Sequence, residues 1–465
     1  MRLIAPMDAI YLWTETTNSP THVIALQIFK PRPGSGPELM EEIYAEMTDP
    51  ALVKPTFKRK PERSLTTGRQ WAWVEDDDMD MTVHVRRTAL PHPGRIRELL
   101  EYVSTIHSTV LDRGRPLWEA RLVEGLQDGR FALCTKLHHS LFDGVRIGRH
   151  LLGGLATDPA ARDSTAPWII PVRHRNRPPR PAEPEPSVLQ RGRNLAGSAG
   201  SMGTSLASSV KALADASLEA LRKGTTTLPF TAPNSILNGP VGSARRFAGD
   251  AWKVDRLKAV AAKTGSTIND VGMAMCGGAL RYYLTELGEL PSTGLVACAP
   301  VSLTGTDGST ARKEGNAIGA VLANLGTDLE DPLERLRRIN SEMHRNKRLM
   351  SDVDPFTATL ISGTAMGGAL LGSVPGMPKS PKPPFNVVIS NVPMTKKSLY
   401  YSGCELDAFY PVSVVLEGQA LNMTLVGYRD EVAIGLTGCR RTLPHLQRLL
   451  IHLETALADL EKAVA

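Results

Sequence analysis

The sequence predicts a mixed α/β (α+β) protein built of two lobes. The chain has 465 residues, more than a single compact domain usually contains. Strand-like and helix-like patterns alternate in residues 1–160 and again in residues 241–465. Residues 161–240 differ in composition, because RHRNRPPRPAEPEP is rich in proline and arginine and a stretch rich in alanine and serine follows it. We therefore expect two lobes, 1–160 and 241–465, joined by a long linker.

In the first lobe, apolar periodicity separates strands from helices. THVIALQIF (21–29) alternates as a strand does, and FALCTKL (131–137) is a short, mainly apolar run of strand length. IRELLEYVSTIHSTVL (96–111) has helical periodicity. HHSLFDG (138–144) then reads as a loop, and VRIGRHLLGGL (145–155) reads as a helix that begins after Gly144. A strand, a loop and a helix in this order often expose reactive side chains at the end of a sheet.

The second lobe repeats this mixture. Residues 254–287 hold two helical patterns joined at Gly265, and Ser266 or Thr267 is expected to cap the second helix. LVACAPVSL (295–303) and FNVVISNVP (385–393) are strand-like runs. The last strongly periodic stretch, residues 443–464, predicts a terminal helix.

Composition and charge narrow the class of protein. Hydrophobic residues make up 42% and charged residues 22%, as in an ordinary globular protein, and the net charge is +6. This charge suits a polyanionic ligand or an anionic membrane surface but is too small to indicate nucleic acid. The five cysteines are far apart, show no metal-ligand spacing and are expected to be reduced and buried.

Two segments bear on membrane association. MRLIAPMDAIYLW, at the start of the sequence, has no signal-peptide apolar region. Residues 355–378 are uncharged and rich in glycine, serine and threonine, so we expect a buried or interfacial helix rather than a membrane span.

The doublet of histidines at 138 and 139 asks for a chemical explanation. Histidine both takes and gives a proton near neutral pH. Neighbouring residues at the end of a strand point in different directions, so one imidazole can face a channel while the other packs inward. Asp143 can anchor the loop, and Gly144 permits a tight turn. Two alternatives stay open, namely hydrogen-bonded core histidines and a metal site, although no carboxylate and histidine set accompanies the pair.

HHSLFDG resembles the HHxxxDG motif of the coenzyme A-dependent acyltransferase superfamily, which includes chloramphenicol acetyltransferase and nonribosomal condensation domains. The whole chain resembles, more narrowly, the bacterial wax ester synthase/diacylglycerol acyltransferase family, and most of all mycobacterial triacylglycerol synthases. Further motifs carry this resemblance: MDAIYLWTE (7–15), PLW (116–118), SILNGP (235–240), STIND (266–270) and FNVVISNVP (385–393). It implies two chloramphenicol acetyltransferase-like lobes, with mixed sheets flanked by helices and an active-site channel between the lobes.

The resemblance also implies roles for the residues of the motif. His139 would be the general base that takes the proton of an acceptor hydroxyl and then protonates the leaving thiolate. His138 and Asp143 would support it, with Asp143 paired to an arginine that the sequence does not identify, and Gly144 would form the turn. Glu15 matches a glutamate thought to face the active site, although a surface position is equally compatible with the sequence.

Other candidates come from the remaining motifs. Asn269 is either a polar group near the reacting centre or a helix brace. The candidate substrate-binding residues are Pro116, Leu117, Trp118, Asp270, Ser390 and Asn391. Trp118 either lines an acyl tunnel or fills the core, and a structural role is the favoured reading of Asp270. Ser390 and Asn391 either contact the reacting carbonyl or form a strand-end turn.

The activity implied is transfer of a long-chain fatty acyl group from acyl-CoA to diacylglycerol, giving triacylglycerol, with no metal and no permanently bound cofactor. A fatty alcohol or another hydroxyl is an alternative acceptor, and a non-catalytic lipid-binding or droplet-associated protein is an alternative function. We expect a cytoplasmic protein, peripherally associated with the inner membrane face or lipid droplets, that binds no nucleic acid. The linker arginines Arg173, Arg175, Arg177 and Arg180 either contact anionic headgroups or are solvated.

Overall fold

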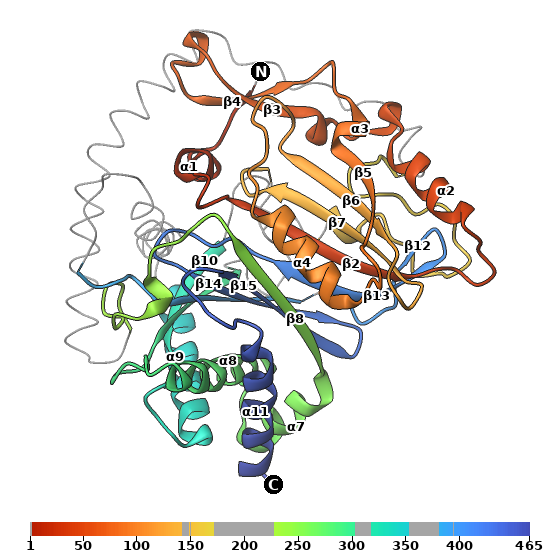
Figure 1. Ribbon diagram of the computed structural model, residues 1–465. Helices are drawn as coiled ribbons and strands as arrows, with labels where there is room; N and C mark the ends of the chain where they lie inside the picture. Colours follow the sequence, from red (N-terminus) through yellow and green to blue (C-terminus); the bar gives the residue numbers. More distant parts are fainter. Residues whose placement is uncertain are drawn as a thin grey trace.

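The computed structural model describes residues 2–141, 148, 150–171, 227–302, 318–352, 381–393 and 395–465. In this part of the chain a small sheet has the order β1-β4-β3, and two six-stranded sheets have the orders β12-β13-β2-β7-β6-β5 and β10-β9-β11-β14-β15-β8. Helices flank the two larger sheets (Figure 1). The predicted class, mixed α/β with two sheet-rich lobes, is confirmed.

The first large sheet carries the histidine doublet at the end of a central strand. Its strands are β2 (His22–Lys30), β5 (Val85–Ala89), β6 (Trp118–Glu124), β7 (Phe131–His138), β12 (Tyr400–Tyr401) and β13 (Cys404–Val412). Every residue of β7 is buried, including the polar residues Thr135, Lys136 and His138. α4 (Ile96–His107) lies across this sheet and packs its apolar side on β2 and β7. The expected strands and the expected helix are thus confirmed.

Smaller elements complete the first lobe. The small sheet is formed by β1 (Arg2–Leu3), β3 (Arg59–Arg63) and β4 (Trp71–Glu75). This lobe also contains the helices α1 (Pro6–Thr14), α2 (Glu38–Met47) and α3 (Met81–His84), with short 3₁₀ turns at Pro50–Leu52, Pro55–Lys58 and Leu65–Thr67. α1 leads directly towards the end of β7, which places its residues beside the doublet.

The C-terminal half contributes strands to the first sheet. β13 pairs antiparallel with β2, and β12 pairs with β13, so residues 400–412 belong to the sheet of the first lobe. The boundaries at 160 and 240 stay predictions, but a division by sequence range does not describe the sheets. A strand that crosses over cannot be read from local periodicity, because the pattern of a strand does not say which neighbour it pairs with.

In the described ranges, four helices cover one face of the second large sheet (Figure 1). Its strands are β8 (Arg245–Lys253), β9 (Val296–Ser302), β10 (Ile318–Asn324), β11 (Val387–Pro393), β14 (Leu421–Tyr428) and β15 (Glu431–Cys439). The helices are α7 (Val254–Thr264), α8 (Ile268–Glu286), α9 (Pro332–Asp352) and α11 (Arg448–Ala463). As predicted, α7 ends at Gly265 in the left-handed conformation and Thr267 caps α8.

The two lobes are joined by hydrogen bonds between α4 and the edge strand β8. The backbone N–H groups of Arg245 and Phe247 donate to Ser108 Oγ and Ser104 Oγ, each at 2.9 Å. An edge strand presents N–H groups that no neighbouring strand accepts, and these serines accept two of them. Phe247 also packs into the apolar core beneath α4, so the lobes share part of one core.

No helix in the described ranges combines the length and the apolar character that a membrane crossing requires. The segment 355–378, for which the sequence predicts a buried or interfacial helix, and the linker arginines lie outside the described residues.

We predict that Ser104→Ala destabilises the protein by about 1–3 kcal/mol, because the buried N–H of Phe247 loses its acceptor. The measurement is the free energy of unfolding in urea. Thr105→Ala, on the exposed side of the same helix, is the control and should change that energy by less than about 0.5 kcal/mol. Equal stability of the Ser104 variant and wild type would show that the contact with β8 does not hold the lobes together.

Candidate functional site

The first histidine of the doublet is a buried structural residue. His138 has no exposed surface, and its Nδ1 accepts from the backbone N–H of Ser140 at 3.2 Å. The proton of a neutral ring is therefore on Nε2, which lies 2.9 Å from Thr21 Oγ. Thr21 Oγ donates in turn to the carbonyl of Tyr11 at 3.0 Å. His138 thus fixes the end of β7 to the segment that follows α1.

The second histidine, His139, contacts the same two residues, Thr21 and Tyr11. His139 is half-buried, and its backbone N–H donates to the carbonyl of Thr21 at 2.9 Å. Its ring stacks on Tyr11, with ring centres 4.3 Å apart and planes 21° from parallel. Burial raises the pKa of Tyr11 to about 12, so this ring stays neutral. The ring of His138 therefore packs inward, as expected for one of two neighbouring histidines at the end of a strand. The ring of His139 is stacked against Tyr11.

Glu15 lies beside His138, and the surface alternative is wrong. Its side chain is 3% exposed and lies 3.4 Å from His138 Nε2 and 3.0 Å from the guanidinium of Arg113. The N–H of Thr21 donates to the same carboxylate at 3.1 Å. Burial alone would raise the pKa of Glu15, but its contacts with His138, Thr21 and Arg113 outweigh burial and lower it to about 2. Glu15 is therefore an anion next to the doublet.

Two motifs of the second lobe meet at one hydrogen bond. Asn391 Nδ2 donates to Asn269 Oδ1 at 3.0 Å, although the two residues are 122 positions apart. Asn269 stands in the first turn of α8 and Asn391 near the end of β11, with Ser390 half-buried before it. The exposed position of Asn391 leaves its amide accessible. The sequence proposed both asparagines separately, and the structure brings them together.

Asp270 completes the capping box of α8 with the N-cap residue Thr267. It is 1% exposed, and its carboxylate accepts from the N–H and hydroxyl of Thr267 at 2.9 and 2.8 Å. Asn340 Nδ2 of α9 donates to the same oxygen at 2.9 Å. These contacts favour the structural reading that the sequence gave as its preference.

The PLW motif lies beneath the doublet. Leu117 is fully buried and its carbonyl accepts from the N–H of His138 at 3.0 Å. Trp118 is 1% exposed, donates to the carbonyl of Phe57 and stacks on Trp168, which favours the core reading of this residue. Pro116 lines a groove beside β5 and β6.

The last three residues of the HHxxxDG motif, Phe142, Asp143 and Gly144, lie outside the described residues, so the roles of Asp143 and Gly144 stay predictions. No group of histidine, cysteine and carboxylate side chains suited to a metal ion occurs in the described part of the chain. All five cysteines are buried, and burial raises the pKa of Cys134, on β7, to about 12, which makes this thiol a poor nucleophile.

Sequence reasoning missed Tyr11, Thr21 and Arg113. Tyr11 is within the MDAIYLWTE motif, and Arg113 is five residues before Trp118. Both therefore lie in or near family motifs, but the sequence does not show which residues they contact. A buried acid needs a cation, and Glu15 in a motif would have justified a search for one. Periodicity does not reveal that this cation comes from the segment between α4 and β6.

Comparison with known proteins identifies the family. Residues 4–272 match the wax ester synthase/diacylglycerol acyltransferase catalytic domain, and residues 314–461 match the WS/DGAT C-terminal domain. The chain belongs to the wax ester synthase/diacylglycerol acyltransferase family. A Mycobacterium tuberculosis relative named "probable diacyglycerol O-acyltransferase tgs2" is 44% identical over all of both chains. The resemblance inferred from the motifs is confirmed.

Solved structures support this membership. The wax ester synthase/diacylglycerol acyltransferase of Marinobacter aquaeolei VT8 is 35% identical, with a TM-score of 0.79 over 100% of both chains. The first condensation domain of the calcium-dependent antibiotic synthetase is 14% identical, with a TM-score of 0.59 over 100% of this chain and 96% of that domain. The family therefore shares its fold with condensation domains, and at this low identity the likeness concerns the fold alone.

We predict that Glu15→Gln lowers the free energy of unfolding by about 1–3 kcal/mol at neutral pH, because Arg113 and His138 lose a buried anion. The folded pKa of about 2 is below the ordinary 4.5, so the wild-type advantage is complete above pH 4.5 and is lost as pH falls through 2. Urea unfolding at several pH values measures it. Asp255→Asn removes a carboxylate from a surface pair with Lys258 and should have little effect. An advantage that does not change with pH would contradict an ionised Glu15.

A second pH effect is expected from two buried histidines next to the site. Burial, followed by the charge of Lys136 for His22 and of Arg245 for His107, holds both pKa values well below 6.5. The unfolded chain takes up protons that the folded chain does not, so stability falls as pH drops below 6.5, by about 1.4 kcal/mol per pH unit for each neutral histidine. Melting temperatures at pH 7.5 and 5.5 test this. The difference should shrink in the variant His22→Gln/His107→Gln and persist in His344→Gln, which changes an exposed histidine.

Proposed function

We propose that this protein is an O-acyltransferase that moves a long-chain fatty acyl group from acyl-CoA to the hydroxyl of diacylglycerol and forms triacylglycerol. The observation that carries the proposal is the placement of His139, half-buried and supported by Tyr11 and Thr21 at the end of β7. Family membership supplies the reaction class, because the names of the Mycobacterium tuberculosis relative and of the Marinobacter aquaeolei protein both contain diacylglycerol acyltransferase activity.

In the proposed reaction His139 acts as the general base. It takes the proton of the acceptor hydroxyl while the hydroxyl oxygen attacks the thioester carbonyl. When the carbon–sulfur bond breaks, the imidazolium returns this proton to the thiolate of coenzyme A, so no proton or acyl group stays on the protein. A positioned base of this kind contributes about 10²–10⁴-fold to the rate.

Other residues of the proposal position these groups. His138 holds the backbone on which His139 stands, and Glu15 fixes the environment of His138. Asp143 and Gly144 are proposed to shape the following loop. Asn269 and Asn391 are proposed to offer amide groups to the reacting carbonyl from the second lobe, because their mutual hydrogen bond orients both.

A channel between the two lobes would bring both substrates to His139, and acyl-CoA enters this proposal as a substrate rather than as a resident cofactor. Fatty alcohols are the second class of acceptor, because wax ester synthase stands in the family description. Peripheral contact with a membrane or lipid droplet, on the cytoplasmic side, follows from the nature of the proposed substrates.

We predict that His139→Ala lowers the rate of acyl transfer by about 10²–10⁴-fold without unfolding the protein. The measurement is the release of coenzyme A thiol from acyl-CoA, with and without diacylglycerol. His344→Ala, which removes an exposed histidine of α9, is the matched control and should keep the wild-type rate. Full activity of the His139 variant would overturn the assignment of this residue.

The same assay distinguishes the acceptors. Thiol release that depends on diacylglycerol supports the proposed reaction, and release that depends only on a fatty alcohol supports the wax ester alternative. Acyl-CoA bound without turnover by the wild-type protein, with any acceptor, would indicate a lipid-binding function instead.

A further inference from the structure

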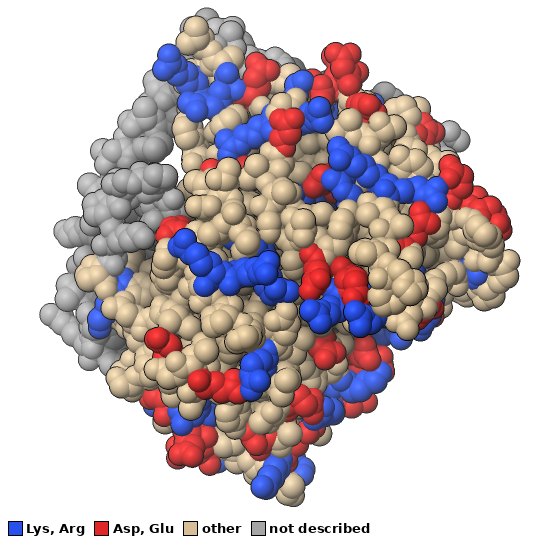
Figure 2. Space-filling view, viewed as in Figure 1, with Lys and Arg blue, Asp and Glu red and all other residues tan. Residues whose placement is uncertain are grey.

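A groove of about 580 Å³ opens on the first lobe, between β5, β6, α4 and the segment that joins α4 to β6. It is a feature that the proposed mechanism does not use. Its walls carry cationic side chains and hydroxyl groups, and basic side chains also gather over this edge of the lobe in the space-filling view (Figure 2). A cavity of this volume accommodates a small organic molecule.

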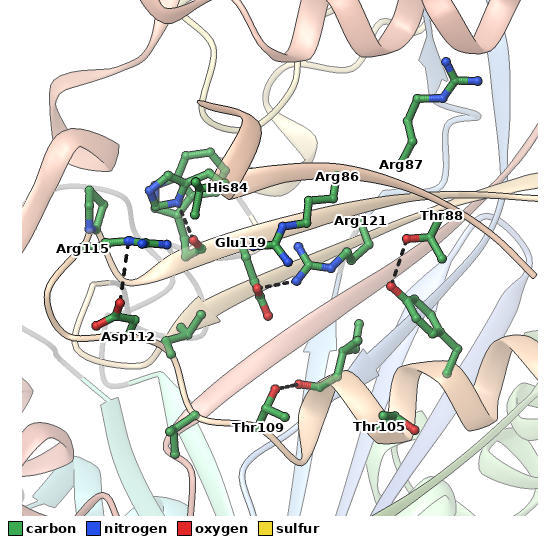
Figure 3. A pocket seen from close by; sticks show the side chains of 17 residues that line it. His84, Arg86, Arg87, Thr88, Thr105, Thr109, Asp112, Arg115, Glu119 and Arg121 are labelled. Carbon is green, nitrogen blue, oxygen red and sulfur yellow. Dashed lines mark hydrogen bonds and ion pairs between the residues drawn. The ribbon is translucent and has the colours of Figure 1, made fainter. Parts of the chain in front are cut away.

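Two arginines of neighbouring strands point into the groove together. Arg86 on β5 and Arg121 on β6 are partners in the parallel register, and their guanidinium groups turn towards the same space (Figure 3). Arg87, the next residue on β5, points away and pairs with Glu41 and Glu124. Both arginines border the groove, but the alternation of a strand turns the guanidinium group of Arg86 towards Arg121 and that of Arg87 away from it.

The cations of the groove exceed its anions. Glu119 is 2.7 Å from Arg121 and 3.1 Å from the buried ammonium of Lys136, so one carboxylate serves two cations. Arg86 has no ion pair with any residue that the structure describes, and the remaining pair, Arg115 with Asp112 at 3.6 Å, is balanced. Glu119 is thus paired with two cations, and Arg86 is left without a carboxylate partner among the described residues.

This arrangement is unfavourable for the protein alone. Like charges side by side on neighbouring strands destabilise a sheet, and Arg86 and Arg121 are placed in this way. An anion that binds between them would remove the repulsion. Hydroxyl groups also line the groove. Thr88 Oγ1 and Tyr102 Oη lie 3.2 Å apart on its wall, and Thr109 is a further lining residue.

We propose that the groove is a binding site for a phosphate-bearing small molecule, with Arg86 and Arg121 as the groups that hold the phosphoryl oxygens. A guanidinium matches two oxygens of a phosphate through parallel hydrogen bonds, and hydroxyl groups satisfy the remaining oxygens. Two sources share this chemistry: the nucleotide end of coenzyme A, and the headgroup of an anionic phospholipid. The inference does not depend on acyl transfer, because it concerns binding alone.

The test is calorimetric titration of the full chain with pyrophosphate at constant ionic strength. We expect Arg86→Gln to weaken binding by about tenfold or more, because a charge-assisted hydrogen bond is lost. Arg87→Gln is the matched control. It removes the same charge from the adjacent position, so it reproduces any general electrostatic effect, and we expect less than about a twofold change.

Two further titrations identify the source of the phosphate. One uses unacylated coenzyme A, and the other uses phosphatidylcholine vesicles with and without phosphatidylglycerol. Binding that Arg86→Gln weakens and Arg87→Gln does not supports the proposal and names the source. Failure of wild type to bind pyrophosphate, equal losses in the two variants, or no dependence on Arg86 with either source would overturn it. None of these measurements involves turnover, so an inactive protein that still binds would refute the proposed function without refuting the site.

Discussion

The hydrogen bond between His138 and Thr21 is the contact on which the candidate site depends. It joins the end of β7 to the segment after α1, and the hydroxyl of Thr21 also donates to the carbonyl of Tyr11. Tyr11 then supports the ring of His139 from one side, while the carbonyl of Thr21 holds its backbone. The buried ring of His138 therefore helps to position its neighbour His139, the residue proposed as the general base.

Local structure could be predicted from the sequence wherever the residues that determine it lie within one short segment. β2, β7 and α4 follow from apolar periodicity, and the boundary between α7 and α8 follows from Gly265 and Thr267. The inward and outward division of the doublet follows from strand geometry alone. The family motifs predicted roles for individual residues, and they indicated Glu15 and Asn269 as candidate site residues.

Pairing between distant segments could not be predicted, because its causes lie in two places at once. The addition of β13 to β2 requires a partner edge that no local pattern identifies. Ser104 and Ser108 read as ordinary polar positions on a helix, and only the arrival of β8 turns them into acceptors. The cation for Glu15 likewise comes from Arg113, 98 positions away, on a segment without regular structure.

The segment between α4 and β6, residues 108–117, contacts both the groove and the doublet. Lys136 donates to the carbonyl of Ile106 in the last turn of α4 and to that of Thr109 at the start of the segment, and Arg113 pairs with Glu15 near its middle. At its end, the carbonyl of Leu117 accepts from the N–H of His138. Because buried polar contacts fix the segment at three points, a ligand in the groove would meet a preformed surface rather than order a loose one. The same segment therefore contacts both the end of β7, where the doublet lies, and the groove.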